Sequence, residues 1–359
     1  MPIVRLSGTV AGPSDPNREM RARLLYSLFA GGWDIYNSNG DQRITLHNIE
    51  RKILESDAFV FLPGVDLDDL FKAVSIFVGY QTLDPNLANK AAVILNSDGS
   101  WDPLLNLLDE LHQVGTIRQD YRQFLLLEKK AEAILPTLER VRRDGTPPVS
   151  RSRREIGDLP VADAPKPASL AATVCVFCSA TIKDPSYLED GYTIGRRLAE
   201  EGFGCVSGAG TTGVMGAVVR GSVEAGGWTG GSNVPHIIEI EGLPEGLSTF
   251  WLRPDIYTRM EAMMDHSDAF VIFPGGAGTV QELLALIIFK RMGHPLMKGK
   301  PILIFNRAVP NRSTGFWDKL ISLLRPWHAE ALFEVVDRLD QIVPACRTSL
   351  EISTGTGQR

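Results

Sequence analysis

Two glycine-rich turns carry the residue types in this sequence that could do chemistry. The first covers residues 207–216 and reads SGAGTTGVMG, between an apolar segment and a segment with helical spacing. Glycines at such a place let backbone N–H groups approach an anion at the positive end of a helix. This turn alone is weakly specific, because a tight strand-to-helix turn without a ligand uses the same residues.

The second turn covers residues 274–282 and reads PGGAGTVQE. Its three glycines open the backbone, Thr279 offers a hydroxyl at the start of a helix, and Glu282 lies one turn inside that helix. A carboxylate at this position could face a bound ligand. The alternative is a solvent-exposed first-turn glutamate, which the helix dipole favours on its own.

The elements around these turns follow a regular order. We expect strands at 173–178, 204–207, 269–273 and 301–306, and helices at 187–201, 214–225 and 280–291. Strands separated by helices predict a parallel sheet with helices on both faces, a doubly wound, Rossmann-like α/β domain. Ligands of such sheets bind beyond the carboxyl ends of the strands, where both glycine turns lie.

An internal repeat accounts for the first half of the chain. Residues 56–64, SDAFVFLPG, match residues 267–275, SDAFVIFPG, and residues 90–96, KAAVILN, match residues 300–306, KPILIFN. The Trp101-Asp102 pair then matches Trp317-Asp318. Two buried strands can resemble each other by chance, but the polar and aromatic positions in the same order favour a duplication.

The two copies differ where chemistry is expected. The first copy has Val65-Asp66 where the second has its glycines, and it lacks the segment between Gly213 and Pro254. We expect Asn48 at the place of Arg259 and Asp69 near the place of Glu282. The amino-terminal copy is therefore predicted to be a degenerate, non-catalytic version of the same fold.

Composition sets the expected domain boundaries. Pro, Ser and Arg accumulate at 143–170, which is predicted to be a linker between a domain at 1–142 and a catalytic domain at 171–345, followed by a flexible tail at 346–359. The stretch 118–143 has helical spacing and is expected to end the first domain as a helix.

Charge and cysteine content exclude some classes of protein. With 44% hydrophobic and 22% charged residues the chain is expected to fold, and its net charge of −6 disfavours nucleic-acid binding. The 4 cysteines are expected to be buried thiols of a reducing compartment rather than disulfides. No apolar run of about 18 residues is present, so we expect a cytoplasmic protein without a membrane partner.

Arg259 precedes Glu282 by 282 − 259 = 23 positions. With this arginine, the two turns resemble the LOG ("lonely guy") family. The resemblance covers about residues 173–327. That family consists of nucleoside 5′-monophosphate phosphoribohydrolases, many of which carry a "possible lysine decarboxylase" label. Met260 follows Arg259 where the family usually has lysine, and residues 254–262 look more like the bacterial purine/pyrimidine nucleotide nucleosidase branch.

The resemblance implies an N-glycosidase that needs no metal and no cofactor. Glu282 would stabilise the transition state, and Arg259 would orient the substrate. The phosphate would be held by residues of the two turns and of the first strand end: Ser179, Gly208, Gly210, Thr211, Gly213, Gly275, Gly276, Gly278 and Thr279. The resemblance also implies a homo-oligomer, a dimer or higher, and suggests that the first copy covers the second as a second subunit would.

Two other functions remain open from the sequence. A non-catalytic carrier of a nucleotide or nucleotide cofactor would keep the glycine turns, and only turnover distinguishes it from an enzyme. A lysine decarboxylase would need a lysine that binds pyridoxal phosphate, and neither glycine turn contains a lysine.

Overall fold

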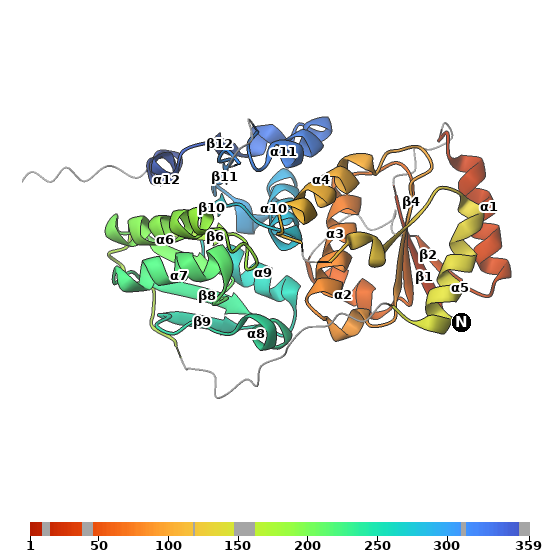
Figure 1. Ribbon diagram of the computed structural model, residues 1–359, viewed down its shortest axis with the longest axis horizontal. Helices are drawn as coiled ribbons and strands as arrows, with labels where there is room; N and C mark the ends of the chain where they lie inside the picture. The colour runs from red at the N-terminus through yellow and green to blue at the C-terminus, as the bar shows by residue number, and fades with distance from the viewer. Residues whose placement is uncertain (9–14, 38–45, 118, 147–161, 310–313, 352–359) are drawn as a thin grey trace, which may run out of the picture. The chain divides into compact units, whose positions relative to one another are not determined.

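The computed structural model describes residues 1–8, 15–37, 46–117, 119–146, 162–309 and 314–351 (Figure 1). The chain forms two compact units, Met1–Arg151 (unit 1) and Ser152–Arg359 (unit 2). Each unit has its own parallel β-sheet. Among the described residues, no helix is long and apolar enough to cross a membrane.

Unit 1 contains a five-stranded sheet in the order β2-β1-β3-β4-β5. Its strands are β1 (Ile3–Ser7), β2 (Asp34–Asn37), β3 (Ala58–Phe61), β4 (Ala91–Leu95) and β5 (Leu125–Glu128). Helices α1 (Arg18–Ala30) and α5 (Ile134–Asp144) cover one face of the sheet, whereas α2 (Leu46–Leu54), α3 (Leu67–Gln81) and α4 (Asp102–Gln113) cover the other (Figure 1).

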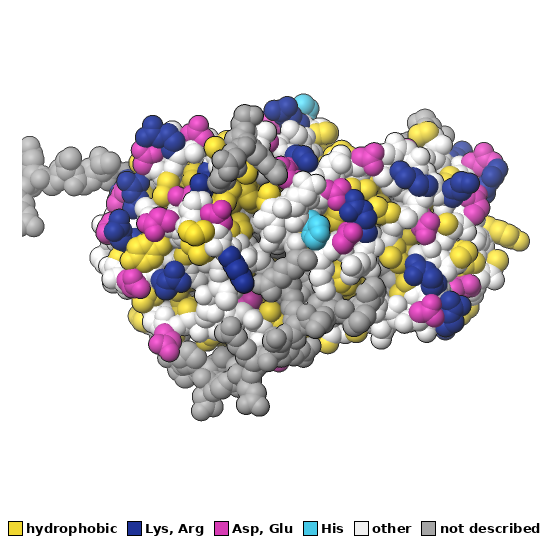
Figure 2. All heavy atoms as spheres, in the orientation of Figure 1, with side chains coloured by type: hydrophobic (Ala, Val, Ile, Leu, Met, Phe, Trp, Pro, Cys, Tyr) yellow, Lys and Arg dark blue, Asp and Glu magenta, His cyan; other side chains and the backbone are white. Residues whose placement is uncertain are grey.

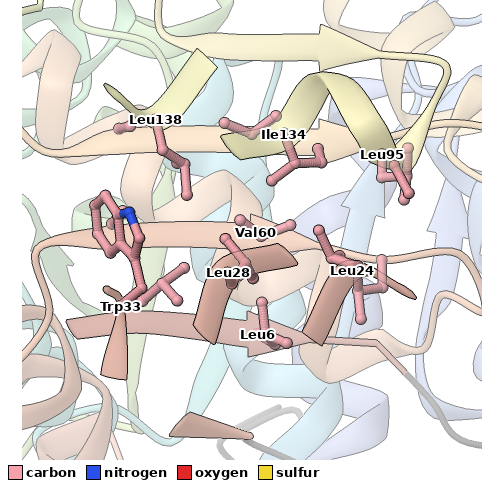
Figure 3. Close-up of a cluster of buried hydrophobic side chains, with 14 of the residues drawn as sticks. Leu6, Leu24, Leu28, Trp33, Val60, Leu95, Ile134 and Leu138 are labelled. Carbon is pink, nitrogen blue, oxygen red and sulfur yellow. The ribbon is translucent and has the colours of Figure 1, made fainter. Parts of the chain in front are cut away.

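The core of unit 1 lies between the sheet and the pair α1 and α5 (Figure 3). Aliphatic side chains from both layers meet there, and each such side chain that is fully buried contributes roughly 1.5–3 kcal/mol. The labelled members are Leu6, Val60 and Leu95 from the strands, Leu24 and Leu28 from α1, Ile134 and Leu138 from α5, and Trp33, which precedes β2.

Unit 2 contains a seven-stranded parallel sheet in the order β12-β11-β10-β6-β7-β8-β9. Its strands are β6 (Thr173–Phe177), β7 (Gly204–Ser207), β8 (Thr229–Asn233), β9 (Thr249–Leu252), β10 (Ala269–Ile272), β11 (Ile302–Phe305) and β12 (Glu334–Val336). Its helices are α6 (Pro185–Glu200), α7 (Gly213–Glu224), α8 (Pro235–Glu241), α9 (Ile256–Asp265), α10 (Ala277–Arg291), α11 (Asp318–Leu324) and α12 (Ile342–Ser349). The doubly wound parallel fold expected from the sequence is confirmed.

The two sheets share a five-stranded plan. In unit 1, β1 pairs with β2 and β3, and β4 continues to β5. In unit 2, β6 pairs with β7 and β10, and β11 continues to β12. Unit 2 adds β8 and β9 beyond β7, and this addition is the segment that the sequence comparison finds missing from the first copy. The shared strand order extends the repeat to the whole sheet.

Some elements differ from the sequence-based expectation. The predicted helix at 118–143 is wrong in its first part, because Leu125–Glu128 form β5, which pairs with β4. Strand pairing decides this segment, since the apolar residues needed for a helical face also suit a sheet edge. Helix α12 continues to Ser349, and Cys346 within it is fully buried, so the expected tail does not begin at 346.

The segment expected to be a linker also belongs partly to unit 2. The N–H of Phe250 donates to the carbonyl of Ala162 at 2.9 Å, and the N–H of Ala164 donates to that of Ser248 at 2.8 Å. These bonds lie along β9, at the end of the sheet. They satisfy backbone groups that an edge strand would otherwise leave unpaired. The remainder of the expected linker, residues 147–161, lies outside the described residues.

Candidate active site

The second glycine turn joins β10 to α10 and leaves the start of that helix without a side-chain cap. Gly276 is the N-cap residue, and the first helical bond runs from the N–H of Val280 to its carbonyl at 3.1 Å. The N–H groups of Ala277, Gly278 and Thr279 precede that bond, so no carbonyl within α10 accepts from them. Nothing lies within 4 Å of a Cβ built on Gly278. An anion is the natural partner of such a helix start.

Gly275 is required by the way this turn folds back on its own helix. A Cβ at Gly275 would lie 2.1 Å from Oγ1 of Thr279, which is far inside contact distance. Thr279 itself is buried, with 2% of its surface exposed. The Gly-Thr combination therefore fixes the path of the backbone around the helix start.

The first glycine turn joins β7 to α7, whose start also lacks a side-chain cap. The N-cap residue is Thr212, and its hydroxyl donates to the carbonyl of Ala180 at 2.9 Å rather than serving the helix. Gly213 has φ of 64°, and a Cβ there would lie 2.6 Å from the carbonyl oxygen of Ser179. Only glycine can occupy that position without displacing the loop after β6.

Both helix starts lie beside the point where the strand order of unit 2 reverses. From β6 the chain proceeds to β7, β8 and β9 on one side and then returns to β10 on the other side. Loops after β6 and β10 therefore leave the sheet in opposite directions, and open α/β sheets bind their ligands at such a point.

Ser179, which follows β6, holds the two glycine turns together. Its N–H donates to the carbonyl of Pro274 at 3.2 Å, and its carbonyl accepts from the N–H of Met215 at 3.0 Å. Its hydroxyl oxygen accepts from the N–H groups of Thr181 at 2.9 Å and Ile182 at 3.0 Å. The structure thus places Ser179 between the turns, with its hydroxyl engaged by its own loop.

Arg259 projects from α9 into the carboxyl end of the sheet. Its Nε donates to the carbonyl of Ser232 at 2.9 Å, and its Nη2 donates to the carbonyl of Gly208 at 3.0 Å. Only 8% of its surface is exposed. A Cβ at Gly208 would lie 2.1 Å from this Nη2, so the glycine gives the guanidinium its room. Two backbone carbonyls thereby fix the orientation of a buried positive charge.

Glu282 lies on α10 within the electrostatic influence of Arg259. Burial raises the pKa of Glu282 to about 8; the charge of Arg259 acts against this rise, and that of Glu241 adds to it. With 9% of its surface exposed, this glutamate is not the solvent-facing first-turn residue of the alternative interpretation. A buried carboxyl group with a pKa near neutrality, under the electrostatic influence of a fixed cation, suits acid–base or electrostatic catalysis.

Glu241 is a site residue that the sequence did not reveal. It is the last residue of α8, and its Oε2 lies 2.9 Å from a Cβ built on Gly210. The hydroxyl of Thr211 donates to its backbone carbonyl, so the first glycine turn rests on the end of this helix. No motif precedes Glu241 at a recognisable spacing, and only the folded chain brings it to the turn.

The predicted residues of both turns, with Ser179, Arg259 and Glu282, thus gather at the ends of β6, β7 and β10. Among the described residues, no group of three or more His, Cys, Asp or Glu side chains could hold a metal ion. Cys175 and Cys178 are free and buried, as expected, and burial raises the pKa of both thiols well above the usual value.

Comparison with known proteins assigns the chain to a family. The family described as "Possible lysine decarboxylase" matches residues 215–348, within unit 2. A probable cytokinin riboside 5′-monophosphate phosphoribohydrolase LOG4 of Oryza sativa subsp. japonica is 30% identical over 172 residues, which are 46% of this chain and 69% of the relative. The chain belongs to the LOG family.

Two further matches cover a similar share of the chain. A cytokinin riboside 5′-monophosphate phosphoribohydrolase of Mycobacterium marinum is 29% identical over 186 residues, covering 48% of this chain and 92% of the relative. Among solved structures, the molybdenum cofactor binding protein of Rippkaea orientalis matches with a TM-score of 0.39 and 18% identity, over 49% of this chain and 96% of that protein. The matches to the phosphoribohydrolase relatives cover about half of this chain.

Proposed function

We propose that unit 2 hydrolyses the N-glycosidic bond of a nucleoside 5′-monophosphate, giving the free base and ribose 5-phosphate. The observation that carries this proposal is the buried Glu282, whose pKa responds to the charge of Arg259, near the carboxyl ends of strands where α7 and α10 both begin without side-chain caps. The names of the LOG relatives support the same reaction.

The phosphate would bind at the two helix starts. Backbone N–H groups of 277–279 would donate to its oxygens, and the positive ends of α7 and α10 would favour its charge. Gly276 and Gly278 would let the phosphate approach the backbone closely. Binding energy from this remote group can then support the chemical step at the sugar.

Glu282 and Arg259 would act on the sugar and the base. As the bond from C1′ to the base breaks, positive charge develops on the ribose ring, and the Glu282 carboxylate would stabilise it. Water supplies a hydroxyl to C1′, while the base leaves with the bonding electrons and receives the proton. Arg259, held by two carbonyls, would orient the substrate.

A panel of substrates tests the proposal. Purified protein is incubated with AMP, GMP, CMP, UMP and adenosine, and released base is measured by chromatography. We expect the monophosphates to be cleaved far better than adenosine, since adenosine lacks the group that the helix starts would hold. Tight binding of nucleotides without release of any base would instead indicate a carrier and contradict the proposed hydrolysis.

We also propose that the protein acts in the cytoplasm as a homo-oligomer, with a small nucleotide rather than a nucleic acid as its partner. The four described cysteines are free and buried, which suits a reducing compartment.

A further inference from the structure

Helix α1 of unit 1 exposes an apolar stripe. Leu25, Tyr26 and Phe29 are exposed by 38%, 76% and 71% of their surfaces, and Ala22 completes the i, i+3, i+4, i+7 spacing. The core-facing side of the same helix is formed by the buried Leu24 and Leu28. A surface helix normally turns its only apolar face to the core, so this second face needs another explanation. Figure 2 shows hydrophobic side chains on the surface of unit 1.

The repeat identifies what this face corresponds to in unit 2. Trp33 donates its N–H to the carbonyl of Leu28, and Phe203 donates to that of Leu198, so the ends of α1 and α6 match with an offset of 198 − 28 = 170. The same offset relates the ends of the two helices themselves, Ala30 and Glu200. It aligns the stripe Ala22, Leu25, Tyr26 and Phe29 with Tyr192, Gly195, Arg196 and Ala199 of α6.

In unit 2 the α6 positions Tyr192, Gly195 and Ala199 pack against α7 and the turn that follows it, whereas the side chain of Arg196 is exposed. A Cβ at Gly195 would lie 2.1 Å from the carbonyl oxygen of Val218, and one at Gly221 would lie 2.0 Å from that of Tyr192. A Cβ at Gly227 would lie 2.5 Å from the Cβ of Ala199. The stripe on α1 therefore occupies the place where α6 receives its neighbouring helix.

Unit 1 has a much shorter segment at the corresponding place in its chain. Only residues 38–45 lie between β2 and α2, whereas unit 2 builds α7, β8, α8 and β9 between β7 and α9. The loss also affects the sheet: β2 is the end strand, and among the described residues no strand pairs with its outer edge. Within the described part of unit 1, an unpartnered helix face and an unpartnered strand edge thus belong to the same side.

We propose that a second copy of this chain covers this side, with β2 pairing antiparallel to β2 of the partner and α1 packing against the partner's α1. A two-fold axis perpendicular to the sheet pairs identical edges and places the two helices on the same face, next to each other. Sheet edges commonly associate in this way when nothing blocks them.

The side chains of α1 favour packing against α1 of a second copy rather than against a helix placed as α7 is placed on α6. Gly191 and Gly195 lack side chains, which lets the backbone of α7 pack directly against α6. At the equivalent positions α1 has Arg21 and Leu25, whose side chains would keep such a helix away. Large apolar side chains pack by interdigitating with others of the same size. In an antiparallel pair, Arg18 at the start of one α1 would lie near the negative carbonyl end of the other.

The mass of the full-length protein in solution tests this proposal. Sedimentation at one fixed concentration is measured for the wild type, for Tyr26→Glu/Phe29→Glu, and for the control Leu252→Glu, which alters an exposed apolar residue in unit 2. We expect the double variant to have half the wild-type mass and an unchanged circular dichroism spectrum, with the control unchanged. A monomeric wild type, or a folded double variant of wild-type mass, would overturn the proposal.

Cross-linking gives a second readout that does not depend on weakening the interface. We expect Tyr26→Cys to form a disulfide-linked dimer on mild oxidation, because position 26 lies near the two-fold axis. Arg196→Cys, at the equivalent position of α6, is the matched control and should stay uncross-linked. Equal cross-linking of both variants, or none in Tyr26→Cys, would contradict the arrangement. Neither experiment depends on nucleotide hydrolysis.

Discussion

The protonation of Glu282 sets the expected pH dependence of activity. Burial raises the pKa of this carboxyl to about 8, so the free protein holds it mainly protonated at neutral pH. If the carboxylate is the catalytic form, kcat/KM for a nucleotide rises with pH through a midpoint near 8 and levels off above it. A kcat/KM that falls between pH 6 and 8 would contradict the role assigned to the carboxylate.

Glu241 provides a separate test of the electrostatics of the site. Its negative charge contributes to the raised pKa of Glu282, so Glu241→Gln should lower that pKa and move the midpoint of the pH profile to lower pH. The measurement is the pH profile of kcat/KM for both proteins, with Glu189→Gln on the exposed side of α6 as control. An identical midpoint in wild type and Glu241→Gln would show that the two carboxyls do not interact.

Glu282 also links pH to stability. A carboxyl whose pKa is higher in the folded than in the unfolded state contributes stability below its unfolded pKa, which is lost as pH rises through the folded pKa. Unit 2 should therefore lose stability between pH 5 and about 8, and Glu282→Gln should reduce that loss. Thermal unfolding at a series of pH values measures this loss of stability. If the unfolding midpoints of the wild type and Glu282→Gln change with pH in parallel, the raised pKa of Glu282 is refuted.

At the scale of elements, the path of the first glycine turn positions the arginine. Gly208→Ala would place a methyl group 2.1 Å from Nη2 of Arg259 and displace the guanidinium. We expect a loss of about 100-fold in kcat/KM, as misplaced catalytic groups typically cause. In a double-mutant cycle with Arg259→Ala the two losses should not add, and additive losses would mean that the glycine acts in some other way.

The corresponding helix start in unit 1 is closed by its own side chains. Asp66 caps α3 by accepting from the N–H of Asp69 at 2.8 Å, and the Asp69 carboxylate accepts from the N–H of Asp66 at 3.3 Å. When α3 and α10 are aligned at their first residues, Lys72 corresponds to Glu282 and Asp69 corresponds to Thr279. Asp69 therefore lies about one turn before the position of Glu282 at which the sequence comparison expected it. The side chain of Asn48 lies outside the described residues. Carboxylates here would repel a phosphate.

Removing this cap should destabilise unit 1 without affecting chemistry. We expect Asp66→Ala to cost about 1 kcal/mol, the usual value of an N-cap, and to lower the midpoint of unfolding. Denaturant titration followed by circular dichroism measures the change, and base release serves as the control because it should stay at the wild-type rate. A loss of base release in a folded Asp66→Ala protein would contradict a non-catalytic unit 1.

The limits of sequence-based prediction follow from what each element depends on. The apolar strands and glycine turns around Pro274 were predictable because burial and backbone geometry both restrict the residues there. Strand β8 reads TGGSN and has no apolar residue; Gly230 instead lets the rings of Trp228 and Trp251 pack against its backbone. Glu241 could not be found either, since long-range folding alone brings it to Gly210.

For the whole molecule, the sequence-based expectation that the first copy covers the second remains to be tested. Expressing residues 152–359 alone removes unit 1 and keeps every candidate site residue, together with Ala162 and Ala164, which bond to the β9 segment. The covering role predicts aggregation or loss of base release, restored by adding residues 1–142. A compact fragment as active as the full chain at equal concentration would show that unit 1 is independent of catalysis.

The most direct test of the central claim compares binding and turnover in the same two proteins. Nucleotide binding is measured by calorimetry, and base and ribose 5-phosphate by chromatography, for the wild type and Glu282→Gln. The wild type should release base and ribose 5-phosphate in equal amounts, while Glu282→Gln should bind the nucleotide with similar affinity and release almost no base. Comparable release by Glu282→Gln, or binding without release by the wild type, would contradict the account.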